Sequence, residues 1–130
     1  MTRATRRAIL AFALAAVLWP TMPVGAEEPK LSAAEIEEAL AGNTIEGDWA
    51  GRPYKQYFDA SGSTIYAEDG RQPSMGKWKA DAVKGAYCSW WEVSGWACYE
   101  VLDGGPDRII WVSPGSGEHY PTKILSGKQL

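Results

Sequence analysis

The sequence has little of what catalytic sites are usually built from, with one histidine and two cysteines in 130 residues. It contains no G-x-S-x-G elbow, H-E-x-x-H motif, P-loop or dinucleotide-binding fingerprint. His119 alone hardly completes a zinc site, and a redox pair would more naturally use C-x-x-C spacing. We therefore expect a protein that is not an enzyme and that holds no cofactor or metal. An unrecognised hydrolase, with two acidic residues converging in a cleft, is the alternative.

No apolar run reaches the roughly 20 residues that a membrane-spanning helix needs. Arginines at positions 3, 6 and 7 precede an apolar run from Ala8 to Trp19, and small residues follow at 24–26. This pattern is typical of a secretory signal peptide. We expect cleavage near Ala26 and a mature domain of residues 27–130 that is periplasmic or secreted. The general secretory and twin-arginine routes both stay open.

Clustered positive charge is also lacking. All 16 acidic residues follow Ala26, whereas three of the 13 basic residues precede it, so residues 27–130 carry a net charge of −6. Nucleic acids and anionic lipid surfaces are bound through groups of lysine and arginine. The lysines here are scattered singly, which argues against both partners. We expect a monomer without an integral membrane span in the mature chain.

The two cysteines flank a turn-like segment, Val93-Ser94-Gly95, almost symmetrically. On an antiparallel hairpin Cys88 faces Cys98, and the flanking aromatic residues then face one another as Trp90 with Trp96 and Tyr87 with Tyr99. Such cross-strand aromatic pairs stabilise sheets. Two cysteines in an exported chain favour one structural disulfide. The segment thus predicts a disulfide-linked β-hairpin.

The segment from Leu31 to Gly42 has the signals of a short helix. Ser32 and Glu35 have the spacing of a capping box, Leu31 and Ile36 occupy the positions of a hydrophobic staple, and Gly42 is a stop. We expect a helix over residues 32–41.

From Thr44 onward, short aromatic and β-branched runs alternate with turn residues, which is typical of an antiparallel sheet. Eight short strands connected in series are expected to close into an up-and-down barrel, because closure removes exposed edges. The fold class expected is mainly β, a small lipocalin-like barrel after one helix. The expected strands are residues 44–50, 54–59, 63–67, 76–81, 86–92, 95–102, 108–112 and 118–124.

Alternation along the strands assigns side chains to the two faces of the sheet. Trp78 lies between two lysines and is expected inside. In the hairpin, Tyr87 and Trp91 are expected in the core, whereas the disulfide lies on the outer wall with Trp90 and Trp96. An interior cavity would be lined by Tyr54, Trp78, Trp91 and Trp111. The alternative is a filled core, since side chains can occupy the whole interior of a barrel this small.

Two resemblances accompany this pattern. Gly47-Asp48-Trp49 is similar to the Gly-x-Trp at the mouth-closing end of lipocalin-like barrels. A longer series resembles a family of small secreted bacterial proteins with a domain of unknown function. This resemblance implies a lipocalin-like β domain in the envelope and gives no catalytic residues to carry over to this sequence. The segments of that series are 31–42, 47–49, Tyr57-Phe58-Asp59, Gly76-Lys77-Trp78, 87–91 and Cys98-Tyr99. Much shorter strands than in true lipocalins argue against a deep cavity.

The functional hypothesis is the binding of a small apolar or aromatic ligand at the barrel mouth. The alternative is recognition of another envelope protein through Trp90 and Trp96, which form the type of exposed aromatic patch that marks binding surfaces. Small envelope inhibitors of metalloproteases and of lysozyme are similar in architecture, each being a small barrel with one disulfide. A protease or lysozyme inhibitor is therefore included in that alternative.

Overall fold

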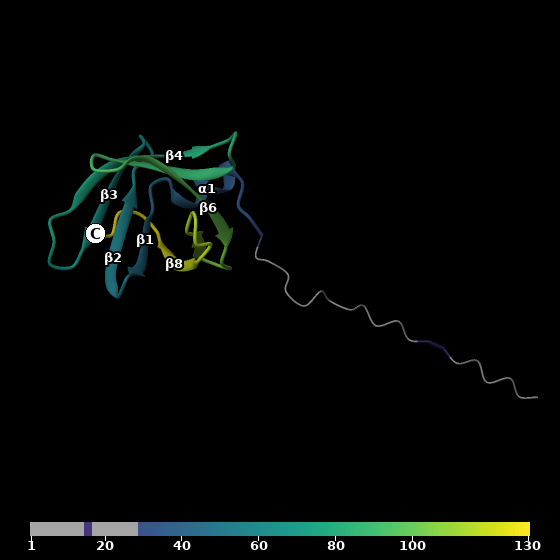
Figure 1. Ribbon diagram of the computed structural model, residues 1–130. Coiled ribbons are helices and arrows are strands. Elements are labelled where there is room, and N and C mark those ends of the chain that lie inside the picture. Colours follow the sequence, from purple (N-terminus) through teal and green to yellow (C-terminus); the bar gives the residue numbers. More distant parts are fainter. Residues whose placement is uncertain (1–14, 17–28) are drawn as a thin grey trace, which may run out of the picture.

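The computed structural model describes residues 15–16 and 29–130. One helix, α1 (Ala33–Leu40), is followed by eight strands that form a closed barrel (Figure 1). Each strand pairs with the next in antiparallel orientation, and β1 also pairs with β8, so the expected mainly β, up-and-down barrel is confirmed. The strands are β1 (Thr44–Trp49), β2 (Arg52–Phe58), β3 (Ser63–Glu68), β4 (Ser74–Asp81), β5 (Ala86–Trp91), β6 (Gly95–Asp103), β7 (Arg108–Val112) and β8 (His119–Leu125). The expected signal peptide lies almost entirely outside the described residues.

The helix begins and ends where its capping residues predict. The backbone N–H of Glu35 donates to Ser32 Oγ at 3.2 Å, and the N–H of Ser32 donates to Glu35 Oε1 at 3.1 Å, which completes the capping box. Ile36 and Leu40, one turn apart, are fully buried. Helical residues span 33–40 within the expected 32–41, because Ser32 and Ala41 are the caps.

The hairpin of β5 and β6 has the register that the cysteine spacing predicts. Cys88 pairs with Cys98, Trp90 with Trp96 and Tyr87 with Tyr99, and the two cysteines form a disulfide. Because the side-chain period of a strand is two residues, this register fixes which face of the hairpin enters the barrel.

Most strand bounds agree with the sequence to within one residue, but β2 and β4 each begin two residues earlier than expected. At β2 the cause is a two-residue turn, in which Ala50 and Gly51 both have positive φ angles, 51° and 78°. Such a turn continues the ladder directly, so Trp49 pairs with Arg52. Pro53 lies inside this ladder, where it pairs with Asp48.

The two ends of the barrel differ. At the end where β1 begins, Ile36 and Leu40 of α1 insert into the core and close the barrel. The fully buried cluster lies in this closed half, and its strand members are Ile45, Phe58, Trp78, Tyr87, Val101 and Ile109. The opposite end, where β1 ends, carries four hairpin connections, β1–β2, β3–β4, β5–β6 and β7–β8, and is open.

Among the residues that the structure describes, none of the helices is both long enough and apolar enough to cross a membrane.

Candidate ligand-binding cavity

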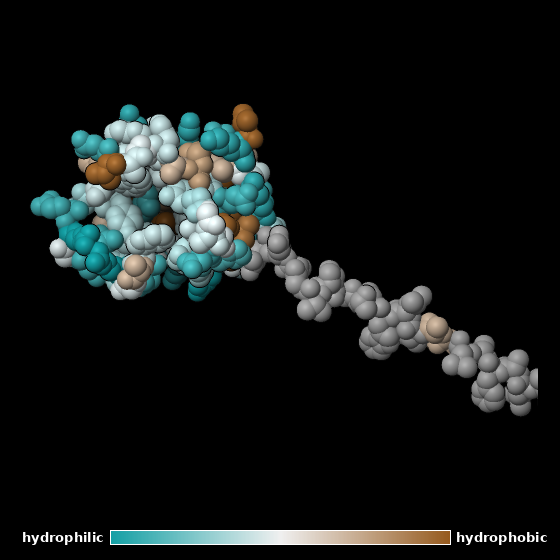
Figure 2. Space-filling view, in the orientation of Figure 1, coloured by the Kyte–Doolittle hydropathy of each residue, from teal (hydrophilic) through white to brown (hydrophobic). Residues whose placement is uncertain are grey.

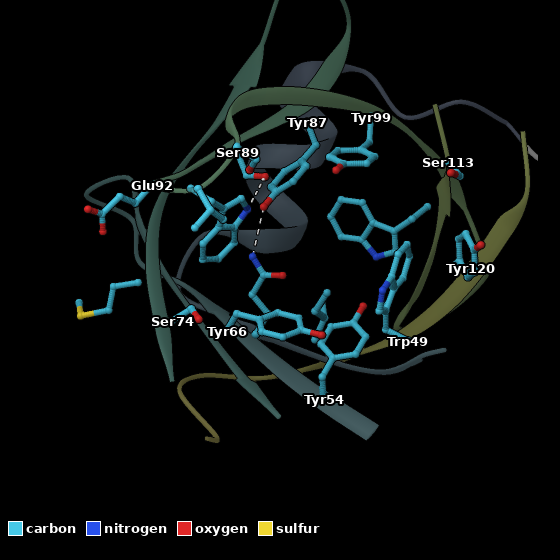
Figure 3. A pocket seen from close by; sticks show the side chains of 17 residues that line it. Trp49, Tyr54, Tyr66, Ser74, Tyr87, Ser89, Glu92, Tyr99, Ser113 and Tyr120 are labelled. Carbon is cyan, nitrogen blue, oxygen red and sulfur yellow. Dashed lines mark hydrogen bonds between the residues drawn. The ribbon is translucent and has the colours of Figure 1, made fainter. Parts of the chain in front are cut away.

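The open half of the barrel encloses a cavity of about 600 Å³. Figure 3 looks into this cavity and shows α1 behind it, while Figure 2 shows a hollow in the face of the molecule among residues of intermediate hydropathy. Ile45 and Tyr87 belong both to the buried core and to the cavity lining, so they form its floor. The interior is therefore filled at one end and hollow at the other.

Aromatic rings form most of the cavity wall. Tyr54 and Tyr66 stack with their centroids 4.9 Å apart, and Trp91 meets Tyr66 edge-on at 6.3 Å. Trp111 packs edge-on against Tyr87 at the bottom of the cavity, with the two ring centroids 4.7 Å apart. The hydroxyl group of Tyr54 points toward the cavity, whereas that of Tyr66 lies beside the Tyr54 ring (Figure 3) and donates to Glu68 Oε1 at 2.9 Å. The wall thus presents ring surface together with a few polar atoms, as ligand sites commonly do.

Two glycines let these rings lie flat against the sheet. A Cβ atom at Gly76 would lie 2.8 Å from the ring of Trp91, and one at Gly47 would lie 3.1 Å from the ring of Tyr54. Both distances are shorter than ordinary van der Waals contact. The missing side chains therefore create the room in which the rings lie along the wall instead of across the cavity.

Hydrogen bonds hold the ring orientations. The indole N–H of Trp91 donates to Ser89 Oγ at 3.2 Å, and that of Trp111 donates to Thr122 Oγ1 at 2.9 Å. Buried Gln56 donates through Nε2 to the hydroxyl oxygen of Tyr87 at 3.2 Å (Figure 3). Because buried polar groups are costly when unpaired, these bonds favour one arrangement of the wall.

Burial raises the pKa of three phenols of the wall. Burial raises the pKa of Tyr54 to about 12. Burial is also the main cause of the raised pKa values of Tyr66 and Tyr87, and for Tyr66 the hydrogen bond to Glu68 adds to the effect. Burial penalises the charged form of each of these three phenols, so they lose their protons only at strongly alkaline pH.

The structure brings together three of the four residues predicted to line a cavity, since Tyr54, Trp91 and Trp111 all line it. The fourth prediction is wrong. Trp78 points inward, as its alternation predicts, but it lies in the closed half, where its ring packs against Phe58 at 5.5 Å. Its indole N–H donates to the carbonyl oxygen of Asp59 at 2.8 Å, which anchors it near the β2–β3 turn.

Trp90 and Trp96 lie on the outer wall beside the disulfide. The Nζ atom of Lys77 lies 5.2 Å from the ring centroid of Trp90, and that of Lys79 lies 4.7 Å from the ring of Trp96. Trp96 is still 49% exposed. The outer aromatic pair therefore makes cation–π contacts with β4, its neighbouring strand.

Trp49 ends β1 at the open mouth, where its half-exposed ring lies 5.0 Å from that of Tyr120. The helix α1, and not the tryptophan of Gly47-Asp48-Trp49, closes the barrel. His119 is exposed at the start of β8. Within residues 15–16 and 29–130, no group of three or more histidine, cysteine or acidic side chains is placed to hold a metal ion.

Comparisons with models of protein families, with curated proteins and with solved structures found no match to this chain. The resemblances drawn from the sequence motifs stay predictions.

Proposed function

We propose that this protein binds a small, largely apolar or aromatic molecule in the cavity of the open half, and that it acts by binding and not by catalysis. The observation that carries the proposal is an aromatic-lined cavity of about 600 Å³ that opens at one end of the barrel. Pockets of roughly 300 to 1,000 Å³ are typical of small-molecule sites. The ionisable groups of its wall are tyrosines and one carboxylate, Glu92, at the rim, and burial raises the pKa of Tyr54 to about 12.

The architecture supports binding because strand pairing and hydrogen bonds constrain the wall. Closed strand pairing fixes the backbone, and the indole groups of Trp91 and Trp111 are hydrogen-bonded within the wall. A site formed before the ligand arrives loses less conformational entropy on binding. The disulfide on the outer wall adds a constraint on β5, the strand that carries Trp91.

The test is titration with N-phenyl-1-naphthylamine, a neutral aromatic probe whose fluorescence rises in apolar surroundings. We expect saturable binding to the disulfide-bonded protein and at least about tenfold weaker binding for Trp91→Ala, which removes a large ring from the wall. Trp90→Ala is the matched control, because this neighbouring residue faces outward and contacts Lys77. Equal weakening by both substitutions, or no saturable binding at all, would contradict the proposal.

We infer further that the protein works outside the cytoplasm. The disulfide Cys88–Cys98 supports this, since structural disulfides persist in oxidising compartments. Mass spectrometry of the protein exported by its own leader tests the inference, with the expected mass that of residues 27–130 with two hydrogens fewer than the reduced chain. An uncleaved, reduced chain would contradict it.

A further inference from the structure

The lysines on the strands around the cavity point to the outside of the barrel. Lys55 lies between the cavity-lining residues Tyr54 and Gln56 of β2, so alternation points it outward. Lys77 and Lys79 contact the outer tryptophans. The described cavity lining contains no lysine, arginine or histidine.

The open end of the barrel is acidic. Its strand ends and turns carry five carboxylates and two guanidinium groups, a net charge of −3: Asp48, Glu68, Asp69, Glu92, Glu118, Arg52 and Arg71. Both arginines are directed to one of these carboxylates, with nitrogen atoms 3.4 and 4.0 Å from Glu68 Oε2. A molecule that enters the cavity therefore passes a mouth of negative charge, which attracts cations.

Two of these carboxylates accept hydrogen bonds from tyrosines that line the cavity. The Tyr66 hydroxyl donates to Glu68 Oε1 at 2.9 Å, and the Tyr120 hydroxyl donates to Glu118 Oε2. Donation to a carboxylate polarises a phenol and increases the electron density of its oxygen and ring. The side chain of Glu68 is only 10% exposed, and the guanidinium groups of Arg52 and Arg71 hold its other oxygen, Oε2, at 4.0 and 3.4 Å, which fixes the carboxylate beside the Tyr66 hydroxyl. These rings are better partners for a cation than isolated phenols are.

From these features we propose that the cavity prefers small organic cations, of the quaternary ammonium type, over neutral and anionic molecules of the same shape. The proposal rests on the proposed function, because it names the class of ligand that the same cavity takes. Aromatic faces attract cations through their quadrupoles, and several such faces around one volume are how proteins hold quaternary ammonium groups. The stack of Tyr54 and Tyr66, with Trp91 edge-on to it, supplies aromatic surface on one side of the cavity. An anion meets no positive side chain there.

The test compares three probes of nearly one shape by isothermal titration and tryptophan fluorescence. Phenyltrimethylammonium is the cation, tert-butylbenzene replaces its nitrogen by carbon and is neutral, and benzenesulfonate is the anion. We expect the cation to bind at least about tenfold tighter than its carbon isostere and the anion to bind weakest. Equal binding of the cation and its isostere would overturn this inference and leave the proposed function intact. Failure of all three probes and of the naphthylamine probe would overturn both.

Two variants, each of which removes one carboxylate, test whether the preference for a cation originates at the mouth of the cavity. Glu68→Gln keeps the size of the side chain and an acceptor for Tyr66, but removes one negative charge from the mouth and leaves Arg52 and Arg71 without their carboxylate partner. Glu100→Gln removes an ion-paired carboxylate 3.6 Å from Lys30 on the outer wall. We expect Glu68→Gln to lower the ratio of cation to isostere affinity severalfold and Glu100→Gln to leave that ratio unchanged. Equal changes in both variants would overturn the assignment to the mouth, whether or not Glu68→Gln also lowers stability, because the ratio is measured within one protein.

Discussion

The two halves of the barrel use the same strands and the same kinds of side chain, but one half is filled and the other is hollow. In the closed half, the rings of Phe58 and Trp78 meet edge to face, and Ile36 and Leu40 of α1 belong to the same buried cluster. In the open half, the rings of Tyr54 and Trp91 lie along the wall and leave the centre empty. Aromatic content alone therefore does not decide whether a small barrel has a cavity.

The difference has two physical causes. The helix supplies Ile36 and Leu40 to the closed half, which completes the close packing that protein interiors adopt. At the open half no element of the described chain covers the mouth, and Gly47 and Gly76 let the rings retract to the wall. The filled half supplies the packed core, and the hollow half holds the cavity on which the proposed function rests.

The largest expected effect comes from removing a ring in the closed half. Phe58 is fully buried and touches both Trp78 and Tyr87, so Phe58→Ala leaves a cavity that its neighbours cannot fill. We expect the free energy of unfolding to fall by about 3 to 5 kcal/mol. Urea denaturation measures it.

The matching substitution at the open end is Met75→Ala, in a side chain that lines the mouth and is 69% exposed. A change of no more than about 0.5 kcal/mol is expected there. Comparable losses at both positions would remove the distinction between a filled and a hollow half.

A smaller loss of stability is expected when a Cβ atom is added at Gly76, a glycine of the cavity wall. A Cβ at Gly76 would lie 2.4 Å from the carbonyl oxygen of Trp90, a backbone atom that cannot turn away. Gly76→Ala is therefore expected to lower the free energy of unfolding by about 2 to 3 kcal/mol and to displace Trp91. The midpoint of urea unfolding and the fluorescence of the naphthylamine probe report the two changes.

Gly47→Ala sharpens this prediction, because the nearest atom to its Cβ, at 2.7 Å, is a methyl group of the Thr122 side chain. A side chain yields more easily than backbone, so the loss is expected to be about 1 kcal/mol. A larger loss at Gly47 than at Gly76 would contradict the account of how the wall is built.

Much of this fold follows from local signals in the sequence. The capping box of Ser32 and Glu35 predicts the helix, and the spacing of Cys88 and Cys98 predicts the register of β5 and β6. That register in turn predicts which aromatic residues face inward, which is why Trp91 is correctly assigned to the cavity. These signals depend on residues that are close in sequence.

The position of a residue along the barrel axis is harder to predict. Trp78 and Trp91 both face inward, but one lies at the level of α1 and the other near the mouth. This level depends on strand stagger and on where the helix docks, which no local pattern encodes. For the same reason the sequence did not predict Tyr66, Tyr120 or the two wall glycines as parts of the cavity. One signal does identify Gly47, because it pairs with Tyr54 across β1 and β2.

The last expected effect is confined to alkaline pH and concerns a single proton on Tyr54, at the boundary between wall and cavity. Its folded-state pKa of about 12 lies above the ordinary value near 10, so the unfolded chain loses this proton first as pH rises. The stabilising contribution is complete below pH 10 and is lost between pH 10 and 12, on the order of 2 kcal/mol. In Tyr54→Phe we expect little change of stability at pH 8 and a shallower decline at alkaline pH. Urea titrations at both pH values, with tyrosinate absorbance near 295 nm, test this, and parallel pH profiles for the two proteins would show that the phenol is not buried in the wall.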